Sequence, residues 1–452
     1  MAKKKLVYVC SECGYESAKW QGQCICGAWN TMKEMAVYQE KEADSRSRKR
    51  SENKPLELSK VGTLDYKRID TGIPELNRVL GNGLVLGSLT LISGEPGIGK
   101  STIIIQAANN IAARYGKVLY VSGEESEEQI KLRADRVCGE ISDELLIFSE
   151  TNLDKIVLAC EEEKPKFLII DSIQTMYSEE IDSAPGSVGQ VRTCGNLLMR
   201  IGKAGKIPIF IVAHVTKSGD LAGPKILEHL VDCVLNFSGE RDRDLRILRA
   251  YKNRFGTTDE IGAFTMNEDG MKGIKNLSGS LLENTDSNIE GSVVAAIYEG
   301  SRPVFFEIQA LVSPANVGFA RRNSVGIDSN RVSMILAVLE KKAGLSLLNY
   351  DVYVNVVGGM KPDSTSTDLG VALAVYSSAT SKISKTKTFA LGEVGLTGDL
   401  RSIRNGDKII QEAQRLGYER VIIPNGSYKS DGKDIEIVKV KSINEAIKEY
   451  FK

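Results

Sequence analysis

A glycine-rich segment around residue 97 has the residue types and the spacing that bind the phosphates of a nucleotide. An apolar strand precedes it, an apolar helix follows it, and its residues are Gly94, Glu95, Pro96, Gly97, Ile98, Gly99, Lys100, Ser101 and Thr102. Glycines let backbone N–H groups turn toward phosphate oxygens, and the N-terminus of the following helix favours their negative charge. The lysine of such a P-loop reaches the β- and γ-phosphates, and the serine hydroxyl ligates Mg²⁺. The segment therefore predicts a site for ATP and Mg²⁺.

Two positions that follow apolar runs could supply the carboxylates that ATP hydrolysis needs. Asp171 ends the run 167–170, and an acid at this distance after a P-loop is expected to hold Mg²⁺. The run 118–121 leads to Glu124 and Glu125, where a carboxylate could polarise the attacking water. Glu124 is the preferred base, and Glu125 assists it or takes its place. A cap for the next helix is the alternative for one of the two glutamates.

Histidine is scarce in this chain, and one of the two histidines follows an apolar run. His214 ends the run 207–213, at a strand end that would face the nucleotide. Its position predicts a sensor of the γ-phosphate, and a purely structural histidine is the alternative.

Strands and helices must alternate to hold these residues at one edge of a sheet, and the sequence has that pattern between residues 64 and 275. Short apolar runs alternate with helical patterns, at 89–92, 118–121, 167–170, 207–213 and 234–237. Such alternation implies a mainly parallel sheet with helices on both faces. We therefore predict an α/β nucleotide-binding domain over 64–275.

Composition divides the rest of the chain into four parts. Residues 1–35 are rich in cysteine and tryptophan, 36–63 are charged and predict a linker, 276–289 are polar and predict a second linker, and 290–452 predict a mixed α/β unit. The formal net charge is zero, so global charge does not indicate a nucleic-acid binder. The sequence has no signal peptide and no apolar stretch of about 20 residues, which predicts a cytoplasmic protein without membrane contact.

A cluster of cysteines near the start of the chain has the spacing of a metal site. Its members are Cys10, Cys13, Cys24 and Cys26. Four thiolates suit tetrahedral Zn²⁺, and the glycine after Cys13 and after Cys26 favours a tight turn. A bound metal would explain how so short a segment folds without a core of its own. The sequence therefore predicts a zinc module over 1–35, and a reduced, metal-free cluster is the alternative.

Several segments resemble known ATPases. Residues 71–81, before the P-loop, are similar to the corresponding segment of RecA- and KaiC-like ATPases. Residues 214–217 and 222–232 resemble the bacterial RadA family, also called Sms. The most specific segment for that family consists of Lys252, Asn253, Arg254, Phe255 and Gly256. The cysteine-rich start and the C-terminal unit are similar to the same family, so the resemblance covers nearly the whole chain and implies a RecA-like core.

This resemblance implies a function as well as a fold. It implies a bacterial DNA-dependent ATPase that processes recombination intermediates and promotes branch migration with RecA in homologous recombination and DNA repair. It also implies a homo-hexameric ring with nucleotide between subunits, in which Lys252 and Arg254 would reach a neighbour's γ-phosphate. One departure concerns the metal. The family carries two Cys-x2-Cys pairs, and the second pair here, Cys24 and Cys26, is one residue shorter.

In such a ring, two loops would face the channel and contact single-stranded and branched DNA. The loops cover 175–190 and 217–225, and the phosphate contacts that we expect are Lys217, Lys225 and Arg192. A solvated surface charge is the alternative for each of these residues. No series of aromatic residues stands out, so base-specific recognition is not expected.

Residues 290–452 resemble the proteolytic domain of Lon proteases, which cleave with a serine and a lysine. Ser366 falls near the position of the nucleophile, but Asp407 matches the position of the lysine, and Lys408 lies about 100° away on a helix. An inactive oligomerisation platform is therefore expected. Its candidate DNA contacts are Lys341, Lys342, Arg321 and Arg322. A Lon-type ATP-dependent protease and a KaiC-like signalling ATPase are the alternative functions.

Overall fold

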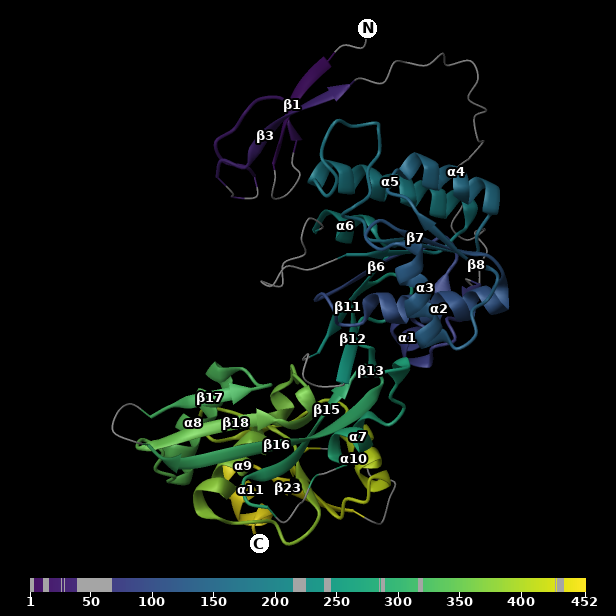
Figure 1. The fold of residues 1–452 in the computed structure, drawn as a ribbon. Coiled ribbons are helices and arrows are strands. Elements are labelled where there is room, and N and C mark those ends of the chain that lie inside the picture. Colours follow the sequence, from purple (N-terminus) through teal and green to yellow (C-terminus); the bar gives the residue numbers. More distant parts are fainter. Residues whose placement is uncertain are drawn as a thin grey trace, which may run out of the picture. The chain divides into compact units, whose positions relative to one another are not determined.

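A computed structural model describes most of the chain, and Figure 1 shows its fold. The described residues are 4–10, 16–25, 27, 29–38, 67–213, 225–239, 245–283, 285, 289–315, 320–426, 428 and 435–452. They divide into two compact units. The first holds the residues before Gly239 together with 246–258 and 266–273, and the second holds Gly239, Leu245, 259–265 and the residues from Ile274 onward.

The N-terminal module is a small antiparallel sheet with the strand order β2-β1-β3. Its strands are β1 (Lys4–Cys10), β2 (Glu16–Ser17) and β3 (Met32–Tyr38). Cys10 pairs with Met32 across β1 and β3, and both residues are buried in one cluster with Cys24.

A nine-stranded sheet contains the P-loop strand and has the order β14-β13-β12-β11-β6-β10-β9-β7-β8. Its parallel strands are β11 (Cys233–Ser238), β6 (Leu89–Gly94), β10 (Ile209–Val212), β9 (Phe167–Asp171), β7 (Val118–Ser122) and β8 (Leu145–Ser149). All but β8 coincide with the apolar runs, so the predicted parallel sheet is confirmed. The edge strand β8 was missed because its residues are only partly buried.

Helices cover both faces of this sheet. Figure 1 shows α4 and α5 on one side of it and α2 and α3 on the other. The helices of the unit are α1 (Pro74–Leu80), α2 (Lys100–Tyr115), α3 (Glu127–Cys138), α4 (Leu153–Glu163), α5 (Val188–Gly205) and α6 (Lys225–Leu230). Parallel strands end at one edge of their sheet, so the residues that follow β6, β7 and β9 meet at that edge.

The antiparallel extension of the sheet begins with β12 (Leu245–Asn253), which pairs with β11. It continues with β13 (Ile261–Asn267) and β14 (Gly270–Gly273), which are joined by a tight turn. Strand β12 reaches Asn253 because its pairing with β11 resumes after an irregularity at Val234 and Leu235.

The second unit is a mixed α/β structure, as predicted, with the strand order β17-β18-β16-β15-β19-β22-β23. The strands are β15 (Ser292–Glu299), β16 (Arg302–Pro314), β17 (Arg322–Val325), β18 (Tyr350–Val356), β19 (Thr388–Ala390), β22 (Arg420–Pro424) and β23 (Glu436–Val440). Its longer helices are α8 (Ser329–Ala343), α9 (Asp368–Thr380), α10 (Gly406–Arg415) and α11 (Ile443–Tyr450). The sequence did not predict α9, because this helix is apolar on nearly all sides and lacks an amphipathic period.

The structure differs from the predicted linker over 276–289, because its first part forms α7 (Leu277–Leu282). The Asn276 side chain accepts a hydrogen bond from the Gly279 N–H at 2.9 Å and so caps the helix. The hydroxyl of Ser278 accepts one from the Phe305 N–H at 3.0 Å, which attaches the helix to β16 of the second unit. Among the described residues, no helix is both long enough and apolar enough to cross a membrane.

Candidate functional site

The P-loop closes β6 and opens α2 in the conformation that phosphate binding requires. Gly97 and Gly99 have φ angles of 79° and 113°, which a side chain would strain. A Cβ on Gly99 would also lie 2.5 Å from the Cε of Met271. Glu95, Pro96 and Gly97 form the exposed tip of the loop, and Ile98 is buried beneath it. The loop therefore leaves its backbone N–H groups accessible at the start of a sixteen-residue helix.

Lys100 lies folded over this loop. Its Nζ donates hydrogen bonds to the carbonyl oxygens of Gly94 at 2.7 Å and Glu95 at 3.1 Å. Burial lowers the pKa of Lys100 to about 8, and the carboxylates of Asp171 and Glu124 oppose that shift. A bound triphosphate would replace the two carbonyl acceptors with charged oxygens and favour the protonated amine.

Asp171 lies at the end of β9, beside the P-loop serine. Its Oδ2 accepts a hydrogen bond from the Ser101 hydroxyl at 3.0 Å and another from the Tyr120 hydroxyl at 2.5 Å. Burial raises the pKa of Asp171, while both hydrogen bonds lower it. A serine hydroxyl and a carboxylate in contact offer the hard oxygen ligands that Mg²⁺ prefers, so the two residues that the sequence selected fit that ion.

Glu124 and Glu125 follow β7 at the same edge, and their surroundings differ. Glu124 Oε1 accepts a hydrogen bond from the hydroxyl of Ser172, which follows Asp171. Glu125 forms an ion pair with Arg133 of α3. Neither glutamate caps α3, because Ser126 and Gln129 form the capping box by themselves. Glu124 is thus exposed at the edge of the sheet beside Ser172, whereas Glu125 is held by Arg133.

A cavity of about 900 Å³ opens beside the P-loop. It lies between the loop, α3 and the turn that joins β13 to β14, and its lining includes Lys100, Ser101, Thr102, Arg133, Arg136 and residues 266–270. The volume is that of a small-molecule site. The sequence selected neither arginine. Their spacing of three residues was the available signal, since residues 133 and 136 lie near one face of α3.

The segment 252–256 is anchored to α1 and the strand before it. The Asn253 side-chain amide donates to the carbonyl of Val79 at 3.1 Å, and Arg68 Nη2 donates to the carbonyl of Phe255 at 2.9 Å. A Cβ on Gly256 would lie 3.1 Å from the Cα of Gly81. Asn253, Phe255 and Gly256 therefore fix the backbone of the segment.

The two cations of this segment have separate supports. Lys252 Nζ donates to the carbonyl of Glu228 in α6 at 2.6 Å, and burial together with nearby Arg254 lowers its pKa. Arg254 Nη1 lies 3.1 Å from Asp232 Oδ1 and remains half-exposed. The second carboxylate oxygen of Asp232 accepts from the Leu89 N–H at 3.1 Å, so this acid connects Arg254 to the start of the P-loop strand.

Two of the four predicted metal ligands are placed in the N-terminal module. Cys10 ends β1 and Cys24 begins a turn closed by the Gly27 N–H, which donates to the Cys24 carbonyl at 2.9 Å. Both cysteines are buried. Cys13 and Cys26 lie outside the described residues.

The predicted DNA contacts are only partly placed. Lys217 lies outside the described residues, as does His214, the predicted sensor of the γ-phosphate. Lys225 begins α6 and its side chain is not described, and Arg192 is exposed on α5. The loop 175–190 is folded around Gln190, whose buried amide donates to the carbonyls of Ser178, Ile181 and Ser183.

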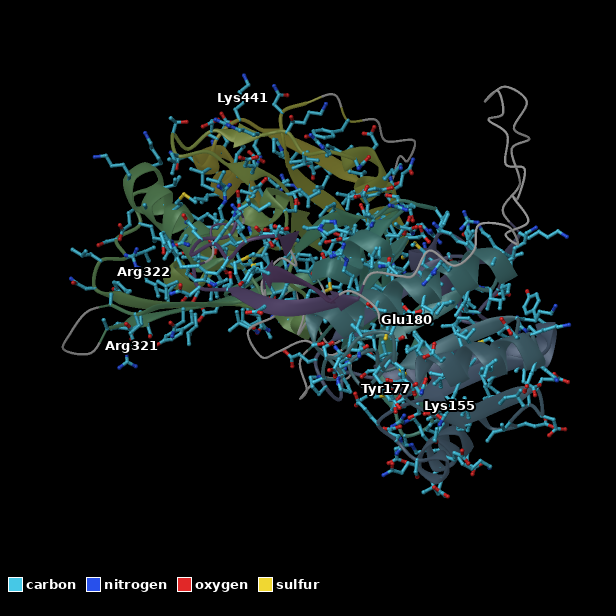
Figure 2. The ribbon with its side chains drawn as sticks, turned by 90° about the horizontal axis from the view of Figure 1, so that it is seen from above. Lys155, Tyr177, Glu180, Arg321, Arg322 and Lys441 are labelled. Atoms are coloured by element: carbon cyan, nitrogen blue, oxygen red, sulfur yellow. The ribbon has the colours of Figure 1, made fainter. Side chains whose placement is uncertain are left out.

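The same loop contains acids and no Lys or Arg. Figure 2 labels Tyr177 and Glu180 of this loop near Lys155 of α4. Its backbone is tied to the start of α4, because the Leu153 N–H donates to the Tyr177 carbonyl at 2.9 Å. Phosphate contacts from this loop would therefore need hydroxyl or backbone donors.

The second unit does not assemble a Ser–Lys dyad from the residues that the sequence suggested. Ser366 is buried, and its hydroxyl lies 3.3 Å from the Ala296 carbonyl and 3.0 Å from the Ser364 hydroxyl. Lys408 Nζ donates instead to the hydroxyl of Tyr298 at 2.8 Å. Figure 2 shows Arg321 and Arg322 at the β17 edge of this unit, where the Arg321 N–H donates to Asp351 and Arg322 lies 3.9 Å from Glu340. Lys341 and Lys342 lie in the last turn of α8.

Protein families match three parts of the chain. An AAA domain matches residues 52–220, the ChlI subunit of Mg-chelatase matches 314–427, and a rubredoxin metal binding domain matches 8–34. The first match contains the P-loop and Asp171, and the last contains all four clustered cysteines. The N-terminal module is therefore of a metal-binding type.

Three relatives match this chain over nearly its whole length. The chain is 48% identical to the DNA repair protein RadA of Halalkalibacterium halodurans over 99% of both chains. It is 47% identical to that of Listeria monocytogenes over 99% of this chain and 98% of the relative. It is 46% identical to that of Bacillus subtilis over 99% of both.

Proposed function

This chain belongs to the RadA family of DNA repair proteins, and from that premise we propose that it is a DNA-stimulated ATPase that moves along single-stranded and branched DNA. In this proposal it promotes branch migration with RecA during homologous recombination. The observation that carries it is the meeting of Ser101 with Asp171 beside a buried P-loop lysine and an accessible Glu124. A chain that binds nucleotide only passively would not need the last of these groups.

The residues of the site have separate roles in ATP hydrolysis. The P-loop backbone and Lys100 hold the phosphates, and Ser101 and Asp171 hold Mg²⁺, which neutralises charge on the phosphate oxygens when it is bound. Glu124 orients the attacking water and accepts its proton. Glu125 is the weaker candidate for this role, because Arg133 already occupies its carboxylate in an ion pair.

The remaining cations act between subunits in a homo-hexameric ring. Lys252 and Arg254 would extend from one protomer to the γ-phosphate held by the next, as arginine fingers do. The contact of Asp232 with both Arg254 and the Leu89 N–H fixes the segment to the first residue of β6. His214 would sense the same phosphate. Lys217, Lys225 and Arg192 would contact DNA phosphates inside the ring.

The ATPase rate with and without DNA tests the function directly. We expect single-stranded DNA to raise the steady-state rate of phosphate release several-fold, by about 3–30-fold, because DNA in the channel brings neighbouring subunits into register. The stimulation should weaken steeply between low and physiological salt, since phosphate contacts release counterions. A rate that DNA leaves unchanged, together with no DNA binding at low salt, would exclude the motor function.

The metal of the N-terminal module is zinc in this proposal, held by Cys10, Cys13, Cys24 and Cys26. We expect Cys24→Ser to lower the bound zinc from about one equivalent to less than about a tenth, because a site that loses a thiolate loses most of its affinity. Metal content after gel filtration measures this. The matched control is Cys138→Ser, which changes a thiol of α3 and should retain the metal. Equal zinc in both variants would refute the assignment.

A further inference from the structure

Tyr120 is a buried phenol that points at the catalytic edge of the sheet. It is the third residue of β7 and is 1% exposed, among apolar neighbours in the core. Its hydroxyl donates to Asp171 Oδ2 at 2.5 Å. A buried hydroxyl is costly unless it is hydrogen-bonded, and a bond to a carboxylate is among the stronger kinds.

The strand register explains how this contact forms. β7 and β9 run parallel, with Tyr120 beside Ile169 and Ser122 beside Asp171. Side chains two residues apart on a strand share a face, so Tyr120 and Asp171 lie on the same face of adjacent strands. A long side chain that leans along its strand can reach the carboxylate from below, while Ser101 reaches it from α2. The tyrosine side chain is long enough to span this offset and carries a donor at its end.

The same carboxylate oxygen accepts from both Tyr120 and Ser101, at 2.5 and 3.0 Å. The serine donor is at the P-loop and would turn toward an ion that arrives there. The tyrosine donor is fixed, because its ring is enclosed by the core. Asp171 therefore keeps one rigid hydrogen-bond partner whether or not the ion site is filled.

We propose that Tyr120 is a positioning residue of the Mg²⁺–nucleotide site, whose hydroxyl holds the Asp171 carboxylate in the orientation that accepts the ion. This proposal rests on the proposed ATPase function. It assigns to a strand-interior tyrosine a role that the P-loop and the strand-end acid cannot perform by themselves. The phenol touches neither phosphate nor water in this role and acts only through Asp171.

Tyr120→Phe in the full-length chain tests the proposal, because it removes one oxygen and keeps the ring. We expect the Mg²⁺ concentration that gives half the maximal ATPase rate to rise about tenfold, as the loss of a hydrogen bond to a charged group implies. Binding of a fluorescent ADP in the presence of EDTA should stay within about twofold of the native value, since the phosphate cradle is intact. If Tyr120 only filled the core, Tyr120→Phe would not raise the Mg²⁺ requirement selectively while ADP binding stayed native.

The matched control is Tyr418→Phe, which removes a buried phenol oxygen from the second unit. It should leave the Mg²⁺ dependence unchanged. In an Asp171→Asn background, Tyr120→Phe should cause little further change, because coupled residues are not additive. If Tyr120→Phe melts near the assay temperature, the extra thermal stabilisation that Mg²⁺ adds to bound ADP is compared at each protein's own midpoint, and it should be smaller in the variant.

A Tyr120→Phe variant with native Mg²⁺ dependence and native Mg²⁺-linked stabilisation would overturn the proposal. The ATPase activity of the native protein distinguishes failure of the positioning role from failure of the proposed function. If it hydrolyses ATP and only the Tyr120 result is negative, the proposed function stands and the positioning role fails. If the native protein does not hydrolyse ATP, the proposed function fails.

Discussion

Lys100→Ala is expected to lower ATP hydrolysis by at least about a thousandfold, the largest single effect in the chain, since it removes charge that stabilises the transferring phosphoryl group. The Nζ of Lys100 now rests on the carbonyls of Gly94 and Glu95, within the loop that cradles phosphate. It is the one cation that the structure places inside the P-loop itself. Phosphate release at saturating ATP measures the loss.

The control for this variant lies on the same helix. Arg114 is an exposed cation in the last turn of α2 and pairs with Asp70 at the surface, at 3.1 Å. Arg114→Ala should keep the native rate within about twofold, because exposed ion pairs contribute little. The Lys100 variant should also keep its melting temperature, since the two carbonyls it leaves can bind water. An activity above a tenth of the native rate in Lys100→Ala would contradict the assigned role.

The sequence located the site residues that lie at the end of a strand or in the loop that follows it. Ser101 and Asp171 could be paired in advance because parallel strands end at one edge of the sheet. The contact between their side chains, at 3.0 Å, agrees with that rule. This rule about strand ends needs only the parallel sheet and no contact with the other parts of the fold.

The parts that were missed depend on contacts between distant segments. Tyr120 looks like any apolar strand residue until the register of β7 on β9 brings it to Asp171. The turn over residues 266–270 lines the nucleotide cavity only because β13 and β14 extend the sheet past β12. Likewise α7 was taken for a linker because its buried leucines are few and its partner, β16, follows it in the chain.

The segment 252–256 shows both what a sequence pattern can locate and what only contacts in the fold reveal. Its family pattern selected five residues without saying which of them act. The structure divides them, since Asn253 and Gly256 hold the backbone against α1 while Lys252 and Arg254 carry the charge. The assembly of the subunits decides whether those charges act on the nucleotide of the same subunit or of a neighbour.

Lys252→Ala is expected to lower ATP hydrolysis by about a hundredfold or more while nucleotide affinity stays within about twofold, as loss of a cation acting from a neighbouring subunit implies. Its Nζ contacts the Glu228 carbonyl and lines no part of the P-loop cavity within the described residues. Equilibrium binding of a fluorescent ATP analogue, measured beside phosphate release, separates the two effects. A parallel loss of affinity would indicate that Lys252 serves its own subunit.

Mixing two inactive variants makes the test decisive. Lys252→Ala keeps an intact P-loop, and Lys100→Ala keeps an intact 252–256 segment. If the cation acts across a head-to-tail interface, an equal mixture forms native pairs at about a quarter of its interfaces, and activity should return to a similar fraction of the native rate. Lys131→Ala, which alters an exposed cation on α3 that pairs with Asp135, mixed with Lys100→Ala controls for dilution. A mixture of the two inactive variants that stays inactive, although gel filtration shows mixed assemblies, would mean that Lys252 does not act in trans.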